Sequence, residues 1–171
     1  MYIRELSVQY RLRPLAGDVI PMTPLRSPAD AAALLVRLIG LEAVEVCVVL
    51  CLSTQWDVLA FHEMSRGTVD ATMVHPRDVF RTALLANARA VIVGHNHPSG
   101  DVTPSPHDAA LTARLHRAGD LIGIPLVDHL VVSTEGRFYS FREAGLIAPQ
   151  SPQGESACLN SSPVSSKSAC S

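Results

Sequence analysis

Two histidines separated by one residue are the feature of this sequence with the clearest chemistry. His95 and His97 follow an apolar run that predicts a buried strand, and residues i and i+2 of a strand point to the same side, with Cα atoms roughly 6–7 Å apart. Asp108 falls in the first turn of the next predicted helix, on its buried stripe, three residues before Leu111. Two neutral nitrogens and one carboxylate are a typical ligand set of hydrolytic zinc, with the fourth position left for water. The spacing therefore predicts a zinc site formed by His95, His97 and Asp108.

A hydrolytic zinc site also needs a proton acceptor that is not a ligand, and Glu63 is the candidate on sequence grounds. Leu59, Phe61 and Glu63 alternate along a predicted strand and share one face, which we expect to be buried. A carboxylate that ends an apolar strand face is costly unless it is paired or functional. In that position Glu63 could take a proton from water and pass it to a leaving nitrogen. The alternative is a strand-end residue turned toward solvent.

Several polar residues near the histidines also have purely structural readings. Ser105 and Asp108 form S-x-x-D ahead of an apolar helix, which is the pattern of a capping box. Asn96 and Asp101 are expected to shape the loop through side-chain turns, with Asp101 as an alternative third ligand. His129 is either a support for a metal ligand or a satisfied core histidine.

The elements that must position these residues form a layered α/β pattern. Ser27 to Asp30 predicts a helix start, with an N-cap hydroxyl and a proline at the first helical position, and this helix runs to about Gly40. The nearly continuous apolar run at 44–52 is typical of a central strand. Further strands are predicted at 6–12 (an edge strand), 56–63, 69–74, 89–95, 125–133 and 136–143, with helices starting at 76 and 106, the second ending near Gly123.

The sequence divides into three parts. Residues 1–24 contain the N-terminal edge strand and a loop, and residues 25–146 contain the predicted zinc site. Residues 147–171 are expected to form a disordered Ser-rich tail, because the last 24 residues hold eight serines and three prolines without apolar periodicity.

Composition excludes several classes of protein. The chain has 171 residues, of which 47% are hydrophobic and 18% charged, and its formal net charge is −2, the profile of an ordinary globular domain. A protein built mainly for nucleic acid needs a Lys/Arg surplus that is absent here, although a local basic patch stays compatible with this balance.

Location and redox state follow from two further observations. No stretch approaches the roughly 18 apolar residues of a membrane helix, and the first residues contain no signal-peptide core, so we expect a cytoplasmic protein without a membrane partner. In that reducing compartment the four cysteines (Cys47, Cys51, Cys158 and Cys170) are expected to be free thiols.

The motif as a whole resembles a known family. His95-x-His97, seven further residues, Ser105, two more and then Asp108, with Glu63 upstream, is similar to the JAMM metalloprotease motif of JAB/MPN domains. More closely, the chain resembles the bacterial RadC-like branch, known as DNA repair protein RadC. The likeness spans roughly residues 4 to 143 and is carried by the segments Arg66-Gly67-Thr68, 74–80, HNHPSGD at 95–101 and Asp128-His129.

This resemblance implies a cytidine-deaminase-like fold, a three-layer α/β/α sandwich with a mixed central sheet, and one Zn²⁺ per chain. It implies that His95, His97 and Asp108 are ligands, that Glu63 is the acid/base and that Ser105 stabilises a tetrahedral oxyanion. The substrate would be a peptide or an isopeptide-linked protein. Longer RadC proteins carry a helix-hairpin-helix segment before this domain, and the stretch ahead of Ser27 is too short to be expected to hold one.

The sequence therefore leaves two functional hypotheses from different classes. The first is a zinc-dependent metallohydrolase with a JAMM-type metallopeptidase or isopeptidase activity. The second is a non-catalytic, zinc-stabilised interaction module associated with DNA repair or recombination, against which the presence of Glu63 and Ser105 counts. A zinc nucleobase deaminase suits the fold but not the ligands, because such enzymes use H-x-E with P-C-x-x-C. The sequence leaves the oligomeric state open.

Overall fold

The computed structural model of the chain describes residues 9–11, 24–67 and 74–147. Its elements are, in chain order, α1 (Pro28–Ile39), β1 (Glu45–Leu52), β2 (Val58–Gly67), α2 (Pro76–Leu85), β3 (Ala90–Asn96), α3 (Pro106–Ile122), β4 (Leu126–Val132) and β5 (Phe138–Ser140). These agree closely with the helices and strands predicted from residue 27 onward, apart from the predicted strand at 69–74.

The five strands form one mixed sheet in the order β2-β1-β3-β4-β5. β1 runs antiparallel to both of its neighbours, β2 and β3. β3 and β4 are parallel and are joined by the crossover helix α3, whereas β4 and β5 form an antiparallel hairpin. β1 and β3 lie inside the sheet, which explains why their sequences are almost continuously apolar.

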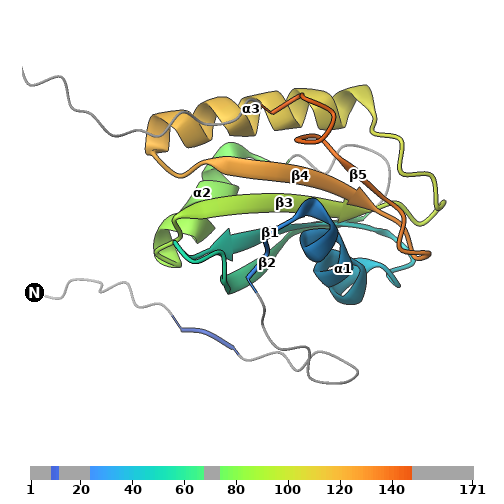
Figure 1. The fold of residues 1–171 in the computed structure, drawn as a ribbon, viewed down its shortest axis with the longest axis horizontal. Coiled ribbons are helices and arrows are strands. Elements are labelled where there is room, and N and C mark those ends of the chain that lie inside the picture. The colour runs from blue at the N-terminus through green and yellow to red at the C-terminus, as the bar shows by residue number, and fades with distance from the viewer. Residues whose placement is uncertain (1–8, 12–23, 68–73, 148–171) are drawn as a thin grey trace, which may run out of the picture.

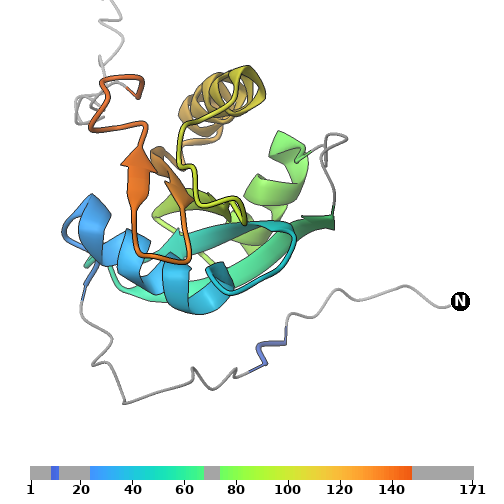
Figure 2. The same ribbon diagram turned by 90° about the vertical axis from the view of Figure 1, so that its right-hand side faces the viewer.

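Helices cover both faces of the sheet (Figures 1 and 2). On one face, Leu35 of α1 packs in a buried cluster with Val48 and Leu50 of β1. On the other face, α2 and α3 contribute Phe80 and Leu115 to a second cluster, which includes alternate residues of β1 and β3. The structure thus has the predicted three-layer α/β/α architecture with a mixed central sheet.

Two of the helices begin with the same local structure. Ser27 caps α1 and Ser105 caps α3, each followed by proline, and each serine forms a reciprocal capping box with the aspartate three residues later. At its other end α3 stops at Gly123, whose φ of +78° is the left-handed conformation that glycine adopts readily.

Several predictions fall at the limits of the described residues. Most of the predicted edge strand at 6–12 lies outside them, and residues 9–11 form no strand. The predicted strand at 69–74 lies outside them except for Val74, and the predicted tail lies outside them except for Ile147, which is buried in the core. Cys47 and Cys51 are buried free thiols, as expected, while the other two cysteines lie outside the described residues. Within residues 24–67 and 74–147, no helix has the length and apolar character needed to cross a membrane.

Candidate metal centre

The C-terminal end of β3 and the N-terminal end of α3 meet at one end of the domain, on the right in Figure 1. His95 stands near the end of β3, in register with Cys47 of β1, and therefore faces the α2/α3 side of the sheet, where Cys47 packs. His97 follows β3 directly, and Asp108 lies in the first turn of α3. His95 and Asp108 are buried, with only 2% and 6% of their surface exposed. The two elements thus bring the predicted ligands to one place.

The two spacings from His95 to the other predicted ligand atoms suit one small cation. His95 Nε2 lies 3.1 Å from His97 Nε2, and 3.6 Å from Asp108 Oδ1. Ligand atoms about 2.0–2.1 Å from a tetrahedral zinc ion are about 3.3 Å apart, a value that these two distances bracket.

A chain of hydrogen bonds beneath the site determines where His95 carries its proton. Thr112 Oγ1 donates to the backbone carbonyl of Asp108, at 2.7 Å. The same hydroxyl oxygen, 2.6 Å from His129 Nδ1, must then accept a proton from that nitrogen. Neutral His129 has no second N–H, so its Nε2 accepts from His95 Nδ1, 3.1 Å away. These proton positions are inferred from the network, as the only arrangement in which each contact joins a donor to an acceptor.

Burial keeps both of these histidines neutral. It lowers the pKa of His129 to about 3, with a smaller contribution from His95. It also lowers the pKa of His95 to about 4, partly offset by the negative charge of Asp108. The single proton of His95 therefore resides on Nδ1, and its Nε2 presents a bare lone pair to the site.

His97 presents a second lone pair at the same point. Its Nδ1 lies 2.6 Å from the backbone carbonyl oxygen of Asp101, to which it must donate. In the tautomer with this single proton, Nε2 of His97 has none. Two acceptor nitrogens at 3.1 Å cannot bond to each other, and a cation between them resolves the conflict. Burial opposes charge on His95, and two imidazole nitrogens beside the Asp108 carboxylate are a donor set that suits a metal ion.

Glu45 is a member of this cluster that the sequence analysis missed. It is the first residue of β1, and one of its carboxylate oxygens lies within 4.8 Å of ring nitrogens of both His95 and His97. Partial burial of the carboxylate raises the pKa of Glu45; the negative charge of Asp108 adds to this rise, and His97 opposes it. The side chain stays exposed at the strand end, where water and a substrate can reach it.

Asn96 connects the two histidines to the position of Glu45. Its Oδ1 accepts a hydrogen bond from the backbone N–H of Val46, at 2.8 Å. Its Nδ2 donates to the carbonyls of Val44 and Glu42, at 3.1 and 3.2 Å. The buried residue between the histidines therefore fixes the backbone on both sides of Glu45, a role well beyond the expected loop turn.

Glu63 lies on the other side of the sheet. It is in register with Val48 of β1, which packs against α1, whereas His95 shares the face of Cys47. Its carboxylate accepts hydrogen bonds from Arg66 Nε and Nη2, at 2.8 and 2.9 Å, and the same arginine also binds Glu42. Glu63 does share a face with Phe61, as predicted, but Leu59, predicted for the same buried face, is 43% exposed and lies where the strand pairing shifts register. The structure does not bring Glu63 to the histidines.

Ser105 is held by the capping box in this structure. Its hydroxyl donates to Asp108 Oδ2 at 2.6 Å, its backbone N–H donates to the same oxygen at 2.7 Å, and the hydroxyl accepts from the N–H of Asp108. The bond from Ser105 thus leaves Asp108 Oδ1 directed at His95. Burial alone would raise the pKa of Asp108, but nearby His95 and the bonds from Ser105 lower it. Asp101, the alternative ligand, holds His97 through its carbonyl, while its carboxylate accepts from Thr103 N–H.

Comparisons with protein families and with individual proteins point to the same family. A family model described as RadC-like JAB domain matches residues 25–146. A UPF0758 protein of Thermotoga maritima is 52% identical over 101 residues, which cover 59% of this chain and 45% of the relative. UPF0758 proteins of Clostridium beijerinckii and Xylella fastidiosa are 37% and 40% identical over 145 and 139 residues, covering 85% and 81% of this chain and 62% of each relative. The chain spans about half the length of these relatives, whose names state no activity.

Proposed function

Because this chain belongs to the RadC-like JAB domain family, we propose that it is a zinc-dependent hydrolase that cleaves peptide or isopeptide bonds. The observation that carries the proposal is the pair of imidazole nitrogens, His95 Nε2 and His97 Nε2, which lie 3.1 Å apart, with the carboxylate of Asp108 3.6 Å from the first. His95 is buried, and a buried lone pair directed at a second imidazole and a carboxylate is costly unless a cation binds there.

The proposed ligands are the Nε2 atoms of His95 and His97 and Oδ1 of Asp108. We prefer Asp108 to Glu45 as the third ligand because it is buried and held in place by Ser105, whereas Glu45 is exposed. Three protein ligands are typical of catalytic zinc, while structural zinc is usually enclosed by four. A bound Zn²⁺ would lower the pKa of water and polarise a substrate carbonyl.

Glu45 takes the role of general base in this proposal. Its carboxylate accepts the proton of the attacking water and delivers it to the leaving nitrogen, which makes it base and acid in turn. Its nearness to both histidines supports this role, and so does its raised pKa, because an effective proton shuttle needs a pKa closer to neutral than that of an ordinary carboxylate. Glu45 thus replaces Glu63, which is paired with Arg66 on the opposite face of the sheet.

Ser105 contributes by orienting Asp108 through the bond from its hydroxyl to Oδ2. A direct role as oxyanion donor, which the family resemblance implies, requires this hydroxyl to turn from Asp108 toward the substrate. We propose both roles for Ser105, the orientation of Asp108 and the donation to an oxyanion. A Ser105→Gly variant distinguishes them from helix capping alone.

The test uses the purified chain, stripped of metal and then reloaded with one equivalent of zinc. A complex peptide library is incubated with it, and new peptide termini are identified by mass spectrometry. We expect zinc-dependent cleavage by the wild-type chain and by Glu63→Gln, and none by Glu45→Gln, whose amide cannot accept a proton. Equal cleavage by Glu45→Gln would contradict its role as base. A zinc-loaded wild-type chain that cleaves neither the library nor isopeptide-linked proteins would contradict the hydrolase and favour an interaction module.

A further inference from the structure

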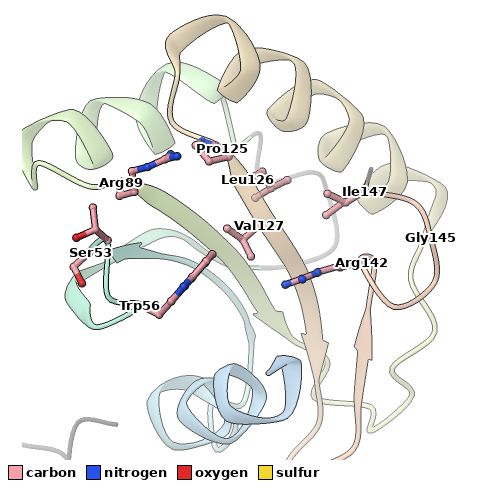
Figure 3. Close-up of a pocket in the computed structure, with 10 residues that line it drawn as sticks. Ser53, Trp56, Arg89, Pro125, Leu126, Val127, Arg142, Gly145 and Ile147 are labelled. Carbon is pink, nitrogen blue, oxygen red and sulfur yellow. The ribbon is translucent and has the colours of Figure 1, made fainter. Parts of the chain in front are cut away.

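A cavity lies at the opposite end of the sheet from the proposed metal centre. It has a volume of about 640 Å³ and is lined by the β1–β2 turn, the residue before β3, the start of β4 and the segment after β5. Figure 3 shows Arg89 and Arg142 reaching toward it from opposite sides, with Trp56 and Val127 between them. This volume is within the range of sites for small molecules.

This cavity is separate from the metal centre. Arg89 precedes His95 by six residues along β3, which places the two about 20 Å apart at the rise of an extended strand. None of the proposed zinc ligands lines it, and neither does Glu45. The residues that line this cavity therefore determine which ligand it can bind.

The charge in the cavity is positive. The side chains of Arg89 and Arg142 are exposed, and within the described part of the chain neither guanidinium forms an ion pair. The lining residues include no aspartate or glutamate. A smaller adjoining cavity shares Trp56 and Arg142 and adds a third arginine, Arg26.

The one acid that lines the adjoining cavity is already engaged by the protein. Asp128 accepts hydrogen bonds from Ser140 Oγ at 2.6 Å and from the backbone N–H groups of His129 and Arg142, at 2.7 and 3.0 Å. Asp128 is buried, and its carboxylate faces these donors. Burial raises the pKa of this carboxyl, and the charge of Arg142 opposes the rise without an ion pair between the two, so the guanidinium can still bind an external anion.

Trp56 lines both cavities with its aromatic side chain. Its φ of +71° is a left-handed conformation that a bulky side chain rarely adopts. Backbone bonds hold it there: Trp56 N–H donates to Ser53, and the Trp56 carbonyl accepts from Leu25 N–H at 2.9 Å. The turn thus keeps an indole that is 41% exposed next to two arginines, and unusual backbone of this kind is commonly retained at ligand sites.

We propose that this cavity binds a nucleoside phosphate, with the base stacked on Trp56 and the phosphate paired with the arginines. A guanidinium offers a planar fork of donors that matches phosphate oxygens, and an indole face binds any nucleobase by stacking. An acidic peptide would satisfy the arginines but would leave the indole without a ring partner. The same chemistry is offered by a free nucleotide and by one nucleotide of a single strand.

The experiment uses the fluorescence of Trp56, which is the only tryptophan of the chain and therefore reports on this cavity alone. Adenosine monophosphate, adenosine, inorganic phosphate, a short oligothymidylate and an acidic peptide are each titrated into the full chain. We expect saturable quenching by adenosine monophosphate, and binding at least about tenfold weaker for adenosine or phosphate alone, since each lacks one of the two contacts. Tighter binding of the oligonucleotide would assign the ligand to a strand, and equal or weaker binding would assign it to a free nucleotide.

Matched variants locate the binding. Arg89→Gln and Arg142→Gln should each weaken nucleotide binding about tenfold or more, because each removes a charge-assisted hydrogen bond. Arg114→Gln, an exposed arginine of α3 that does not line the cavity, should bind like the wild type. The proposal is overturned if no nucleotide gives saturable quenching, if only the acidic peptide does, or if the two cavity variants bind as tightly as Arg114→Gln. None of these readouts depends on zinc or on hydrolysis.

Discussion

His95 Nδ1 lies 3.1 Å from Nε2 of His129, and this buried contact fixes which nitrogen of His95 is available to a metal. The chain of bonds continues through Thr112 to the backbone of Asp108. One proposed ligand is thus coupled to another through two residues that do not themselves reach the metal. Such supporting residues typically change metal affinity 10–100-fold when they are replaced.

Thr112→Val tests this chain, because it removes the hydroxyl and preserves the side-chain shape. We expect the zinc dissociation constant, measured by competition with a chelator, to rise about 10–100-fold. Thr82→Val is a matched control, since Thr82 donates to the carbonyl four residues back in α2 as Thr112 does in α3. Equal zinc affinity of the two variants would show that the tautomer of His95 is set in another way.

Ser105→Gly distinguishes helix capping from a role of Ser105 in zinc binding and catalysis, and Ser27→Gly provides its control. Both serines cap a helix through the same S-P-x-D box. Glycine is a fair N-cap, so each variant should lose only a few tenths of a kcal/mol of unfolding free energy in urea titrations. Only Ser105→Gly should bind zinc more weakly, and its turnover should fall about 10²–10³-fold if the hydroxyl also serves the oxyanion. Normal zinc affinity and turnover would reduce Ser105 to a helix cap.

Asn96→Ala should uncouple Glu45 from the histidines. The change removes one buried and two partly buried hydrogen bonds to β1 and the segment before it, at a cost of about 2–4 kcal/mol in the free energy of unfolding. Because His95, His97 and Asp108 keep their own supports, we expect nearly normal zinc stoichiometry with a large loss of turnover. A variant that keeps full turnover would show that the position of Glu45 does not matter.

Low pH should destabilise the metal-free protein through its buried histidines. Burial lowers the pKa of His95 to about 4 and of His129 to about 3, from 6.5 in the unfolded chain. Between about pH 6.5 and pH 4 the unfolded state therefore binds more protons, and stability falls as pH falls, by at most about 1.4 kcal/mol per pH unit for each histidine. Urea unfolding midpoints between about pH 7 and pH 4 check this. A constant midpoint over that range would mean that the two imidazoles take up protons in the folded state.

Local sequence signals predicted most of the fold. The S-P-x-D boxes at Ser27 and Ser105 mark the starts of α1 and α3 because capping depends only on neighbouring residues. The apolar runs of β1 and β3 identified interior strands for a similar reason, as burial on both faces requires apolar side chains throughout.

Local sequence signals do not reveal Glu45, the proposed general base. Glu45 reaches the histidines only because β1 pairs with β3, a contact between residues about fifty positions apart that no local pattern encodes. Glu63 looked suitable because its apolar face was predicted to be buried, but alternation does not tell which of the two sheet faces that is. The signal that favours Glu45 is a carboxylate at the first position of the most apolar strand.

The coordination of zinc by this chain tests the central claim most directly. X-ray absorption at the zinc edge, recorded on protein loaded with one equivalent of metal, should show only nitrogen and oxygen ligands at about 2.0–2.1 Å, including two imidazoles. The same measurement on the His95→Ala/His97→Ala double variant should show that spectrum lost. Sulfur at about 2.3 Å, or an unchanged spectrum in the double variant, would contradict a centre formed by His95, His97 and Asp108.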